Sequence, residues 1–502
     1  TLLTAAQALG IPLATLCYHG DAGHVPSCQV CTVRLGNGQF VPACAYPASD
    51  GLVVTTDSPE VAALRRGSLE LLLSDHLGDC FSPCQRVCPA HVAIPQVLRL
   101  VREGHHGEAL RELKRDLALP LVSGYLCGAT CESGCRRQAH DEGVAIRQIE
   151  RFLAEQDLAS GQPWLPPCAP PSGHRVAIVG AGPCGLAAAW YLVQEGHAVT
   201  VFEAGEQAGG HLLTQASADQ LPPAKLAEEV ALIWRLGATL RTAQRLGENL
   251  TLADLTRDFG VVLLTTGVPD KAWATQLGLK AGVAGLTVGA DLATNLPGVM
   301  AAGHAIRKTG KVVHALADGK RAATLVHARL MGLVLPVEGK AFSVKLGKVD
   351  ADEMAAFLAN ANPAGRQVSD LPLDAATAAR ETQRCLHCDC RKADSCQLRQ
   401  LADRYGASAT RFGQSRGRFS QELRHGLVVF EPGKCIKCGN CIQIANAQAE
   451  PLGLGFIGRG FAMQVQPPPG TPWPEALRRA AEAEGQSVKV TRKFAGPAQQ
   501  AC

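Results

Sequence analysis

The cysteines are the feature that most limits what this chain can fold into. Twenty cysteines occur in 502 residues, and 17 of them lie in five groups with short gaps between members. Cysteines this close in sequence rarely bridge each other but readily share a metal centre. A disulfide scaffold, the competing interpretation, is typical of small secreted chains with little core. The grouping therefore favours metal or iron–sulfur ligation, and only Cys168, Cys184 and Cys502 lie outside the groups.

The composition excludes other classes of protein. With 46% hydrophobic residues the chain can form real cores, and its length suggests three or four domains. A net charge of +4 and 5% aromatic residues argue against a nucleic-acid surface. The longest apolar runs, such as residues 261–264, are as long as a strand and far shorter than a membrane span. We therefore expect a cytoplasmic protein without a transmembrane segment.

The first cysteine group has the spacing of a two-iron cluster. Cys17, Cys28 and Cys31 can come from one loop, and Cys44 from a later strand. Zinc is the alternative ligand. The surrounding segments "LCYHGDAGHVPSCQVCTV", "VPACAYP" and "RRGSLELLLSDH" resemble the 2Fe–2S ferredoxin domain of the large iron–sulfur subunit of complex I and of NAD-linked hydrogenases. The resemblance implies a β-grasp domain over residues 1–75, read as short strands and loops, whose missing first hairpin suggests a truncated start.

Residues 76–165 are expected to be helical and to hold two 4Fe–4S clusters. Apolar residues recur at helical intervals between two cysteine trios. "SPCQRVCPAHVAIPQVLRLVREGHHGEAL" and "GYLCGATCESGC" resemble the small subunit of glutamate synthase and the related domain of dihydropyrimidine dehydrogenase, in which two clusters interleave across the trios. The resemblance implies one cluster on Cys80, Cys84 and Cys135, and another on Cys88, Cys127 and Cys131.

Two residues other than cysteine are candidate ligands in this segment. Glu150 stands at the position of that family's ligand that is not a cysteine. The family has one more cysteine upstream of Cys80, and His76 is the nearest replacement here. Complex I-type proteins also use a ligating histidine at the position of His76. A surface histidine and a carboxylate on a helix surface are the alternatives.

A dinucleotide-binding pattern follows a proline-rich linker at residues 163–171. In "HRVAIVGAGPCGLAAAWYLVQEGHAVTVFEA" a strand, a glycine turn, a helix and a second strand succeed one another. Gly180, Gly182 and Gly185 let backbone N–H groups approach a pyrophosphate at the helix N-terminus, where Pro183 opens the helix. Glu203 ends the second strand, near the place of the acidic residue that binds the ribose.

Later motifs resemble the FAD domain of the same glutamate synthase family. They are "EAGEQAGGHLL", "VVLLTTG" and "LPGVMAAGH", and their candidate cofactor-binding residues are Gly210, Thr266, Gly267, Gly303 and His304. The family has Asp in place of His304. It also inserts an NAD(P)H-binding domain between the last two motifs, but here only 35 residues separate Gly267 from Gly303, too few for a βαβ unit. We expect an FAD domain at residues 174–335 without that insertion.

Residues 336–425 are interpreted as a linker that carries the fourth cysteine group. The segment also includes one amphipathic stretch, "DADEMAAFLANA", expected to pack rather than to function. Four thiolates within 12 residues suit either a 4Fe–4S cluster or zinc. They are Cys385, Cys388, Cys390 and Cys396.

Residues 426–502 resemble the ferredoxin-like module near the cluster-rich end of hydrogenase and complex I subunits. The likeness rests on "EPGKCIKCGNC", with Cys435, Cys438 and Cys441. A ferredoxin run would continue with a cysteine at position 445, where this chain has Ala445. A three-iron cluster, or a cube completed by another ligand, would then form. Cys502 is a candidate for that ligand, but the favoured interpretation of this residue is a free terminal thiol. The glycines at 453, 455 and 458 are interpreted as a loop without a nucleotide.

These features predict a multidomain protein of α+β and α/β domains that relays electrons between partner subunits. A flavin can take up two electrons together and release them singly, whereas clusters carry one each. No catalytic triad, paired carboxylates or Gly-Lys-Ser phosphate loop is visible, so we expect substrate chemistry in a hydrogenase-like or formate dehydrogenase-like partner. Two alternatives stay open: a stand-alone NAD(P)H-dependent flavin oxidoreductase, and an assembly subunit whose flavin fold is empty.

Overall fold

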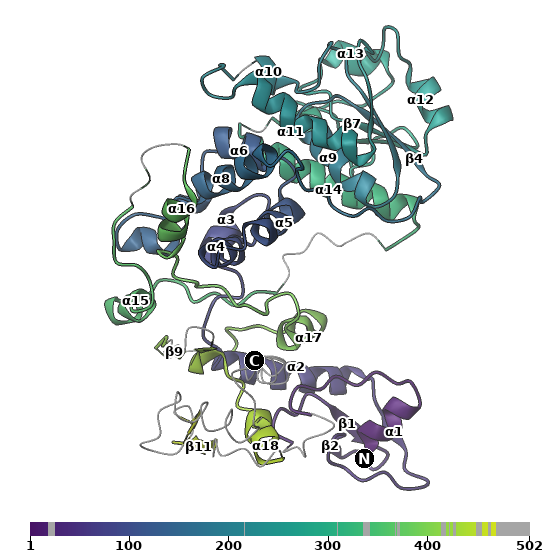
Figure 1. Ribbon diagram of the computed structural model, residues 1–502. Helices are drawn as coiled ribbons and strands as arrows, with labels where there is room; N and C mark the ends of the chain where they lie inside the picture. Colours follow the sequence, from purple (N-terminus) through teal and green to yellow (C-terminus); the bar gives the residue numbers. More distant parts are fainter. Residues whose placement is uncertain are drawn as a thin grey trace. The chain divides into compact units, whose positions relative to one another are not determined.

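The computed structural model divides the chain into two compact units, each assembled from separate stretches of sequence (Figure 1). Unit 1 comprises Thr1–Phe81, Lys340–Asn360 and Cys388–Cys502, and unit 2 comprises Ser82–Gly339 and Ala361–His387. The residues that the structure describes are 1–18, 26–214, 216–308, 310–334, 342–366, 368, 372–412, 418–420, 422–424, 428–447, 454–459 and 463–467.

The start of unit 1 is a small antiparallel sheet with two helices. Strands β1 (Thr32–Leu35), β2 (Phe40–Pro42) and β3 (Val54–Thr55) lie in the order β2-β1-β3. The expectation of strands and loops alone is wrong here, because α1 (Leu2–Ala8) and α2 (Pro59–Ser74) are helices.

Helix α2 begins where the side chain of Ser58 accepts a hydrogen bond from the Val61 N–H and Pro59 fills the first turn. Arg65, 4% exposed, donates from Nε to the Thr32 carbonyl at 3.0 Å. The helix is thereby attached to β1, next to the loop that carries the first cysteine group.

The rest of unit 1 consists of short elements from the second half of the chain. Its amphipathic stretch forms α15, which a capping box of Asp350 and Glu353 begins and which buries Met354 and Phe357, as expected for packing. The predicted loop around the last glycines is wrong in part, because residues 455–457 pair as a strand with residues 464–466. The elements are α15 (Ala351–Leu358), α17 (Gln397–Tyr405), β9 (Glu422–Arg424), β10 (Val428–Phe430), η3 (Pro432–Lys434), α18 (Asn440–Ala447), β11 (Gly455–Ile457) and β12 (Gln464–Gln466).

The first part of unit 2 is helical, as predicted. The stretch with helical periodicity is split at Gly104, whose φ of +79° ends one helix before the next begins. Helices α6 and α8 pack side by side (Figure 1). The elements are α3 (Pro83–Val87), α4 (Ile94–Arg102), α5 (His106–Asp116), α6 (Pro120–Leu126), α7 (Thr130–Ser133), η1 (Arg136–Ala139), α8 (Ile146–Ala159) and, later in the chain, α16 (Ala375–Thr382).

The second part of unit 2 is the predicted parallel sheet with helices, in the order β6-β5-β4-β7-β8. Its strands are β4 (Arg175–Val179), β5 (Ala198–Phe202), β6 (Thr239–Arg241), β7 (Val261–Leu264) and β8 (Val299–Ala301). The helices are α9 (Pro183–Gln194), α10 (His211–Thr214), α11 (Pro223–Leu236), α12 (Leu252–Asp258), α13 (Lys271–Gln276), η2 (Gly303–Ala305) and α14 (Val312–Leu330).

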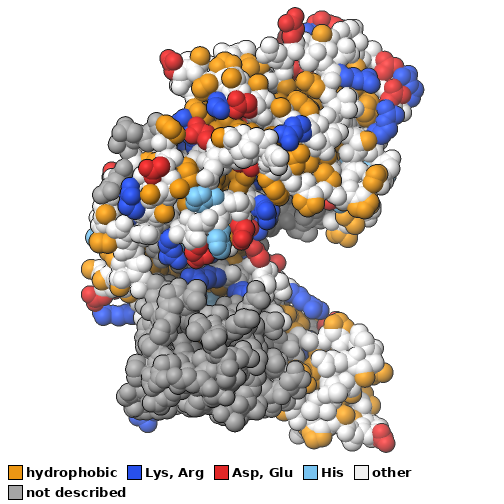
Figure 2. Space-filling model, viewed as in Figure 1, with side chains coloured by type: hydrophobic (Ala, Val, Ile, Leu, Met, Phe, Trp, Pro, Cys, Tyr) orange, Lys and Arg blue, Asp and Glu red, His pale blue; other side chains and the backbone are white. Residues whose placement is uncertain are grey.

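Helices α9 and α14 cross closely beside this sheet (Figure 1). A Cβ atom on Gly319 of α14 would lie 2.3 Å from the Cys184 carbonyl oxygen of α9, so the contact requires glycine. In the view of Figure 2, hydrophobic, acidic and basic side chains all occur on the visible surface of this part of unit 2. Among the described residues, no helix combines the length and the apolar character needed to cross a membrane.

Glu229 of α11 joins the helical and sheet-containing parts of unit 2. Its side chain is 2% exposed and accepts hydrogen bonds from the backbone N–H groups of Leu121 and Val122, at 2.7 and 2.8 Å. These donors belong to the first turn of α6, where a helix offers them no acceptor of its own. Burial raises the pKa of Glu229 to about 7, against the opposing effect of these two hydrogen bonds.

We expect Glu229→Ala to lower the free energy of unfolding by about 2 kcal/mol, because two buried backbone donors lose their acceptor. Glu228→Ala is the matched control. Its carboxylate is exposed and pairs with Lys225 on the helix surface, so its loss should cost less than about 0.5 kcal/mol. Thermal unfolding of both variants checks this, and equal melting temperatures would contradict the role of Glu229.

Candidate functional site

The four cysteines of the first group lie together in unit 1. Each is 5% exposed or less. The Cys17 thiol forms hydrogen bonds with the thiols of Cys28 and Cys44, and Cys31 forms one with Cys44. Between Cys28 and Cys31 the loop turns at Gln29, whose φ is +57°. The arrangement fits the predicted two-iron site: four buried thiols touch one another without a disulfide.

A second set in unit 2 contains a carboxyl group. Cys88, Cys127, Cys131 and Glu150 are each 7% exposed. Burial, and then the nearby Glu150 carboxylate, raise the pKa of the Cys88 thiol to about 11. The same two causes raise that of Cys131. The four predicted ligands are therefore neighbours.

Glu150 is not on the helix surface, so that alternative is wrong. It lines a hollow whose other residues are all aliphatic, and burial raises its pKa to about 8. A carboxylate in such surroundings is costly unless a positive charge accompanies it. A cluster iron would supply that charge, so the residue fits the predicted ligand role. The other lining residues are Val92, Ile94, Val97, Leu98, Leu113, Ile146 and Ile149.

A third set in unit 2 brings together cysteines that are distant in sequence. Cys84 and Cys385 are buried in one hydrophobic core, and Cys135 packs partly buried against it. Arg137, fully buried near Cys135, donates from Nη1 to the Arg384 carbonyl at 2.8 Å, next to Cys385. The predicted cluster of Cys80, Cys84 and Cys135 stays a prediction, since Cys80 belongs to unit 1.

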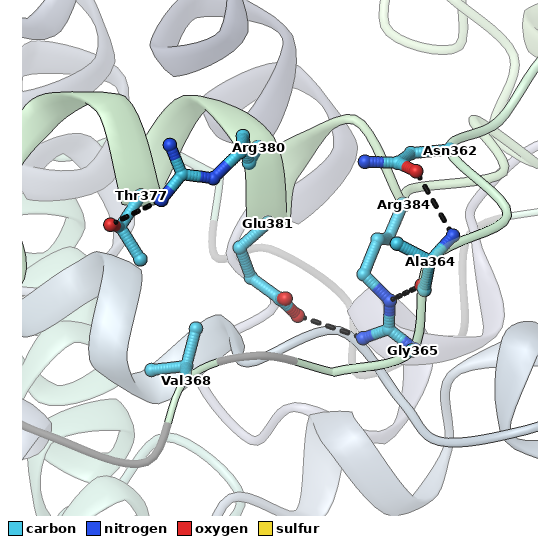
Figure 3. A pocket seen from close by; sticks show the side chains of 8 residues that line it. All are labelled: Asn362, Ala364, Gly365, Val368, Thr377, Arg380, Glu381 and Arg384. Carbon is cyan, nitrogen blue, oxygen red and sulfur yellow. Dashed lines mark hydrogen bonds and ion pairs between the residues drawn. The ribbon is translucent and has the colours of Figure 1, made fainter.

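Arg384 holds the backbone next to Cys385 in place. Its guanidinium is 1% exposed and bonds the Glu381 carboxylate at 2.9 Å and the Ala364 carbonyl at 3.0 Å (Figure 3). Figure 3 shows the Arg384 side chain paired directly with Glu381 of α16, and both residues line a small hollow beside the segment around Gly365. The network is structural and fixes the chain just before the cysteine.

Three further cysteines meet in unit 1 beside His76. The Cys390 N–H donates to the Cys80 carbonyl at 3.2 Å, and Cys396 lies within electrostatic reach of both thiols. The Nδ1 atom of His76 is buried without a hydrogen-bond partner. Burial, and then the nearby Lys434 charge, lower the pKa of His76 to about 4, so the ring is neutral at pH 7.

The last cysteine group also gathers in unit 1. Burial and the charges of Cys435 and Cys438 raise the pKa of Cys441 to about 11. The Lys437 N–H donates to the Cys435 sulfur at 3.4 Å. Cys502 and Gly453 lie outside the described residues, so the fourth ligand stays open. Cys388, a member of the fourth cysteine group, is also buried in unit 1, where 8% of its surface is exposed. No described set of three or more His, Cys, Asp or Glu side chains is arranged to hold a single metal ion.

The glycine turn at the start of α9 has the geometry expected for a pyrophosphate. Gly180 has a φ of +107°, and a Cβ there would lie 2.6 Å from the Thr265 carbonyl oxygen. A Cβ on Gly185 would lie 2.0 Å from the Gly180 carbonyl oxygen. By contrast, a Cβ on Gly182 would meet no atom within 4 Å. The turn therefore requires glycine for its shape, and Gly182 borders open space at the helix N-terminus that precedes Pro183.

Neighbouring residues hold this turn in place. Glu203 accepts hydrogen bonds from the N–H groups of Ala181 and Gly205, at 2.8 and 2.9 Å. Thr265, 7% exposed, donates from Oγ1 to the Gly180 carbonyl at 2.9 Å. Sequence reasoning missed Thr265, although it belongs to the same "TTG" motif as Thr266 and Gly267.

The remaining predicted dinucleotide contacts adjoin the turn or the α9–α14 contact. A Cβ on Gly210 would lie 3.0 Å from the Gly182 Cα, and one on Gly303 would lie 2.8 Å from the Cys184 sulfur. Gly267 has a φ of +81° and borders open space. His304 faces His211, with 6.2 Å between the ring centres. The fold thus provides a dinucleotide cradle that the residues present fit.

Comparisons with known families agree with this geometry. Residues 1–59 match the 2Fe-2S iron-sulfur cluster binding domain, residues 78–162 match dihydropyrimidine dehydrogenase domain II with its 4Fe-4S cluster, and residues 178–233 match the NAD(P)-binding Rossmann-like domain. The chain therefore carries a 2Fe–2S domain, a 4Fe–4S domain and a dinucleotide-binding domain, and the resemblances predicted for these three segments are confirmed.

Individual relatives are subunits of oxidoreductases. The NADP(+)-dependent formate dehydrogenase subunit beta of Moorella thermoacetica is 36% identical over 37% of this chain and 29% of its own length. The glutamate synthase [NADPH] small chain of Bacillus subtilis is 36% identical over 36% of each chain. This chain therefore spans about a third of the length of these relatives. An NAD+-reducing [NiFe]-hydrogenase structure is 38% identical over 15% of this chain and 32% of that chain, with a TM-score of 0.15.

We expect Gly182→Leu to weaken dinucleotide binding at least about tenfold, because a Cβ at this position meets no protein atom and the rest of the side chain would occupy the cradle. Iron content should not change. Gly107→Leu, at an exposed position on α5 with no atom within 4 Å, is the control. Flavin absorbance after purification measures the effect, and full flavin occupancy in Gly182→Leu would refute this placement of the site.

Cys28→Ser should abolish the two-iron electron paramagnetic resonance (EPR) signal, because the Cys17–Cys44 site loses one of four thiolates. Signals of the four-iron clusters should persist. Cys168→Ser, which alters an exposed thiol of the linker, should leave every signal intact. Loss of a four-iron signal with the two-iron signal retained would show that the ligands are wrongly assigned.

Proposed function

We propose that this chain is an electron-transfer subunit of a multi-subunit oxidoreductase, with FAD, one 2Fe–2S cluster and several 4Fe–4S clusters. The observation that carries the proposal is one group of buried side chains that pack together in unit 1. It contains Cys17, Cys80 and Cys438, which come from three different candidate sites. Cofactors bound by residues of one small core would lie close together, and stepwise transfer of single electrons requires short distances between centres. The domain division given above is part of the same proposal.

The core of unit 2 supports the same proposal. Its main core includes Cys88 and Cys131 of one candidate cluster, Cys84 and Cys385 of another, and Cys184 of α9. Cys184 lies two residues beyond Gly182, in the first turn of the helix that faces the pyrophosphate cradle. A dinucleotide in this cradle and clusters on these cysteines would therefore be held by one packed core.

The residues of the cradle have defined tasks in this proposal. The N-terminal N–H groups of α9 bind the pyrophosphate, while Glu203 and Thr265 keep the turn open for it. Bound FAD would exchange electrons in pairs or singly, which links two-electron chemistry to one-electron clusters. The thiolates, together with burial and hydrogen bonds to their sulfurs, set the cluster potentials.

The names of the relatives support a partner that carries the substrate chemistry. The names "subunit beta" for the formate dehydrogenase relative and "small chain" for the glutamate synthase relative each describe one component of a larger enzyme. We propose a formate dehydrogenase-like or hydrogenase-like partner in the cytoplasm. A second candidate is a stand-alone NAD(P)H-dependent flavin oxidoreductase, which the match of residues 178–233 to an NAD(P)-binding domain favours.

Anaerobic titration of the isolated chain separates the two candidates. We expect the chain to contain bound flavin whose absorbance falls only slowly when NADH or NADPH is added. A low-potential one-electron dye should instead reduce the flavin and the clusters together. Rapid bleaching by either nicotinamide would support the stand-alone enzyme instead. Clusters without any flavin would support the remaining alternative, an assembly subunit. Gly182→Leu serves as the flavin-free control.

A further inference from the structure

A buried arginine of unit 1 has no carboxylate to neutralise it. Arg65 of α2 is 4% exposed, and no carboxylate of the described residues forms an ion pair with it. We propose that the two-iron cluster of the first cysteine group is the counter-charge of Arg65, and that Arg65 raises the reduction potential of this cluster. The inference deepens the proposed function and rests on its two-iron centre.

The guanidinium of Arg65 bonds only neutral acceptors. Its Nε donates to the Thr32 carbonyl at 3.0 Å, and its Nη1 donates to the Tyr405 hydroxyl at 3.1 Å. Its Nη2 is buried without a hydrogen-bond partner. The Nε bond alone is sufficient to attach α2 to β1, so attachment does not explain why a full positive charge is buried here. Such a charge is costly in a protein interior unless an anion accompanies it.

The two acidic residues of α2 are engaged elsewhere. Glu60 is exposed in the first turn and accepts a hydrogen bond from the Ser58 hydroxyl at 2.8 Å. Glu70 is buried, but its carboxylate forms an ion pair with Arg411 at 2.6 Å. The helix that carries Arg65 therefore provides no anion for it.

The first cysteine group lies beside this guanidinium. Thr32, whose carbonyl accepts the Nε bond, directly follows Cys31 in the chain. Leu69, four residues further along the same face of α2, is fully buried in one group of side chains with Cys17 and Cys28. The inner face of α2 thus lies against the site at which four thiolates would hold the two irons.

The charge of a two-iron cluster is the one that a buried guanidinium requires. A cluster of two irons and two sulfides held by four thiolates is net negative, and reduction adds one further negative charge. A fixed cation beside it attracts the reduced form more strongly than the oxidised form, because the Coulomb energy grows with the charge. Arg65 therefore favours reduction of this cluster over that of an identical cluster without the cation.

The next residue of α2 is a matched control for Arg65. Arg66 is also a cation, and its Nε donates to the Tyr405 carbonyl at 2.9 Å, so both arginines contact the same residue at the end of α17. Arg66 is exposed, however, and water and salt screen an exposed charge. A comparison of the two positions separates the effect of a buried charge from the effect of the contact between α2 and α17.

Redox titration of the two-iron EPR signal in the full, anaerobically prepared chain tests the proposal. We expect Arg65→Met to lower the ratio of reduced to oxidised cluster about tenfold at a fixed ambient potential, which is a fall of about 59 mV in the midpoint potential of a one-electron couple. Arg65→Lys should restore most of the difference, because the charge remains. Arg66→Met should change the ratio less than about twofold.

Tyr405→Glu tests the charge while Arg65 stays in place, because the new carboxylate would pair with the guanidinium. It should lower the midpoint potential as Arg65→Met does, whereas Tyr405→Phe should leave the ratio within about twofold of the parent. Where Arg65→Met does not retain its two irons, Tyr405→Glu decides the question.

An unchanged midpoint potential in Arg65→Met or Tyr405→Glu, with the two-iron signal at full intensity, would overturn the proposal. So would equal falls in Arg65→Lys and Arg65→Met, because packing rather than charge would then set the potential. A parent chain without any two-iron signal would instead overturn the proposed function, so the two failures are distinguishable.

Discussion

The burial of thiols and other ionisable groups is the constraint on which the rest of this structure depends. A buried thiolate or carboxylate is costly in an apolar interior unless a cation or a metal centre compensates for it. This chain buries cysteines from all five groups, and it buries Glu150 among aliphatic side chains. Iron bound by these groups would convert an unfavourable interior into a stable one. The same iron would supply the redox chemistry that the relatives suggest.

Contacts between distant segments complete the candidate sites. In unit 1 a backbone hydrogen bond joins Cys390 to Cys80, and in unit 2 the buried Arg137 binds the carbonyl next to Cys385. The segments that return late in the sequence are therefore more than linkers, because they bring ligand residues to sites begun near the N-terminus. Binding of metal to such sites is coupled to folding.

Sequence reasoning was sufficient wherever the chemistry is local. The glycine turn from Gly180 to Gly185 follows from the spacing of its glycines between a strand and a helix. The first cysteine group likewise predicts four thiols that the structure brings together. Helix α2 was missed because its start depends on the Ser58 cap rather than on an apolar pattern. The neighbourhood of Cys80 and Cys396 could not be predicted, since no local pattern reveals which late segment returns to which early one. Thr265 was missed because its role lies in packing against the glycine turn.

Combined analysis of iron, acid-labile sulfide and zinc in the anaerobically purified chain tests the central claim most directly. The account predicts iron and sulfide in nearly equal amounts, with EPR signals of both two-iron and four-iron clusters and little zinc. Stoichiometric zinc, or thiols free of iron and sulfide in a folded chain, would contradict it.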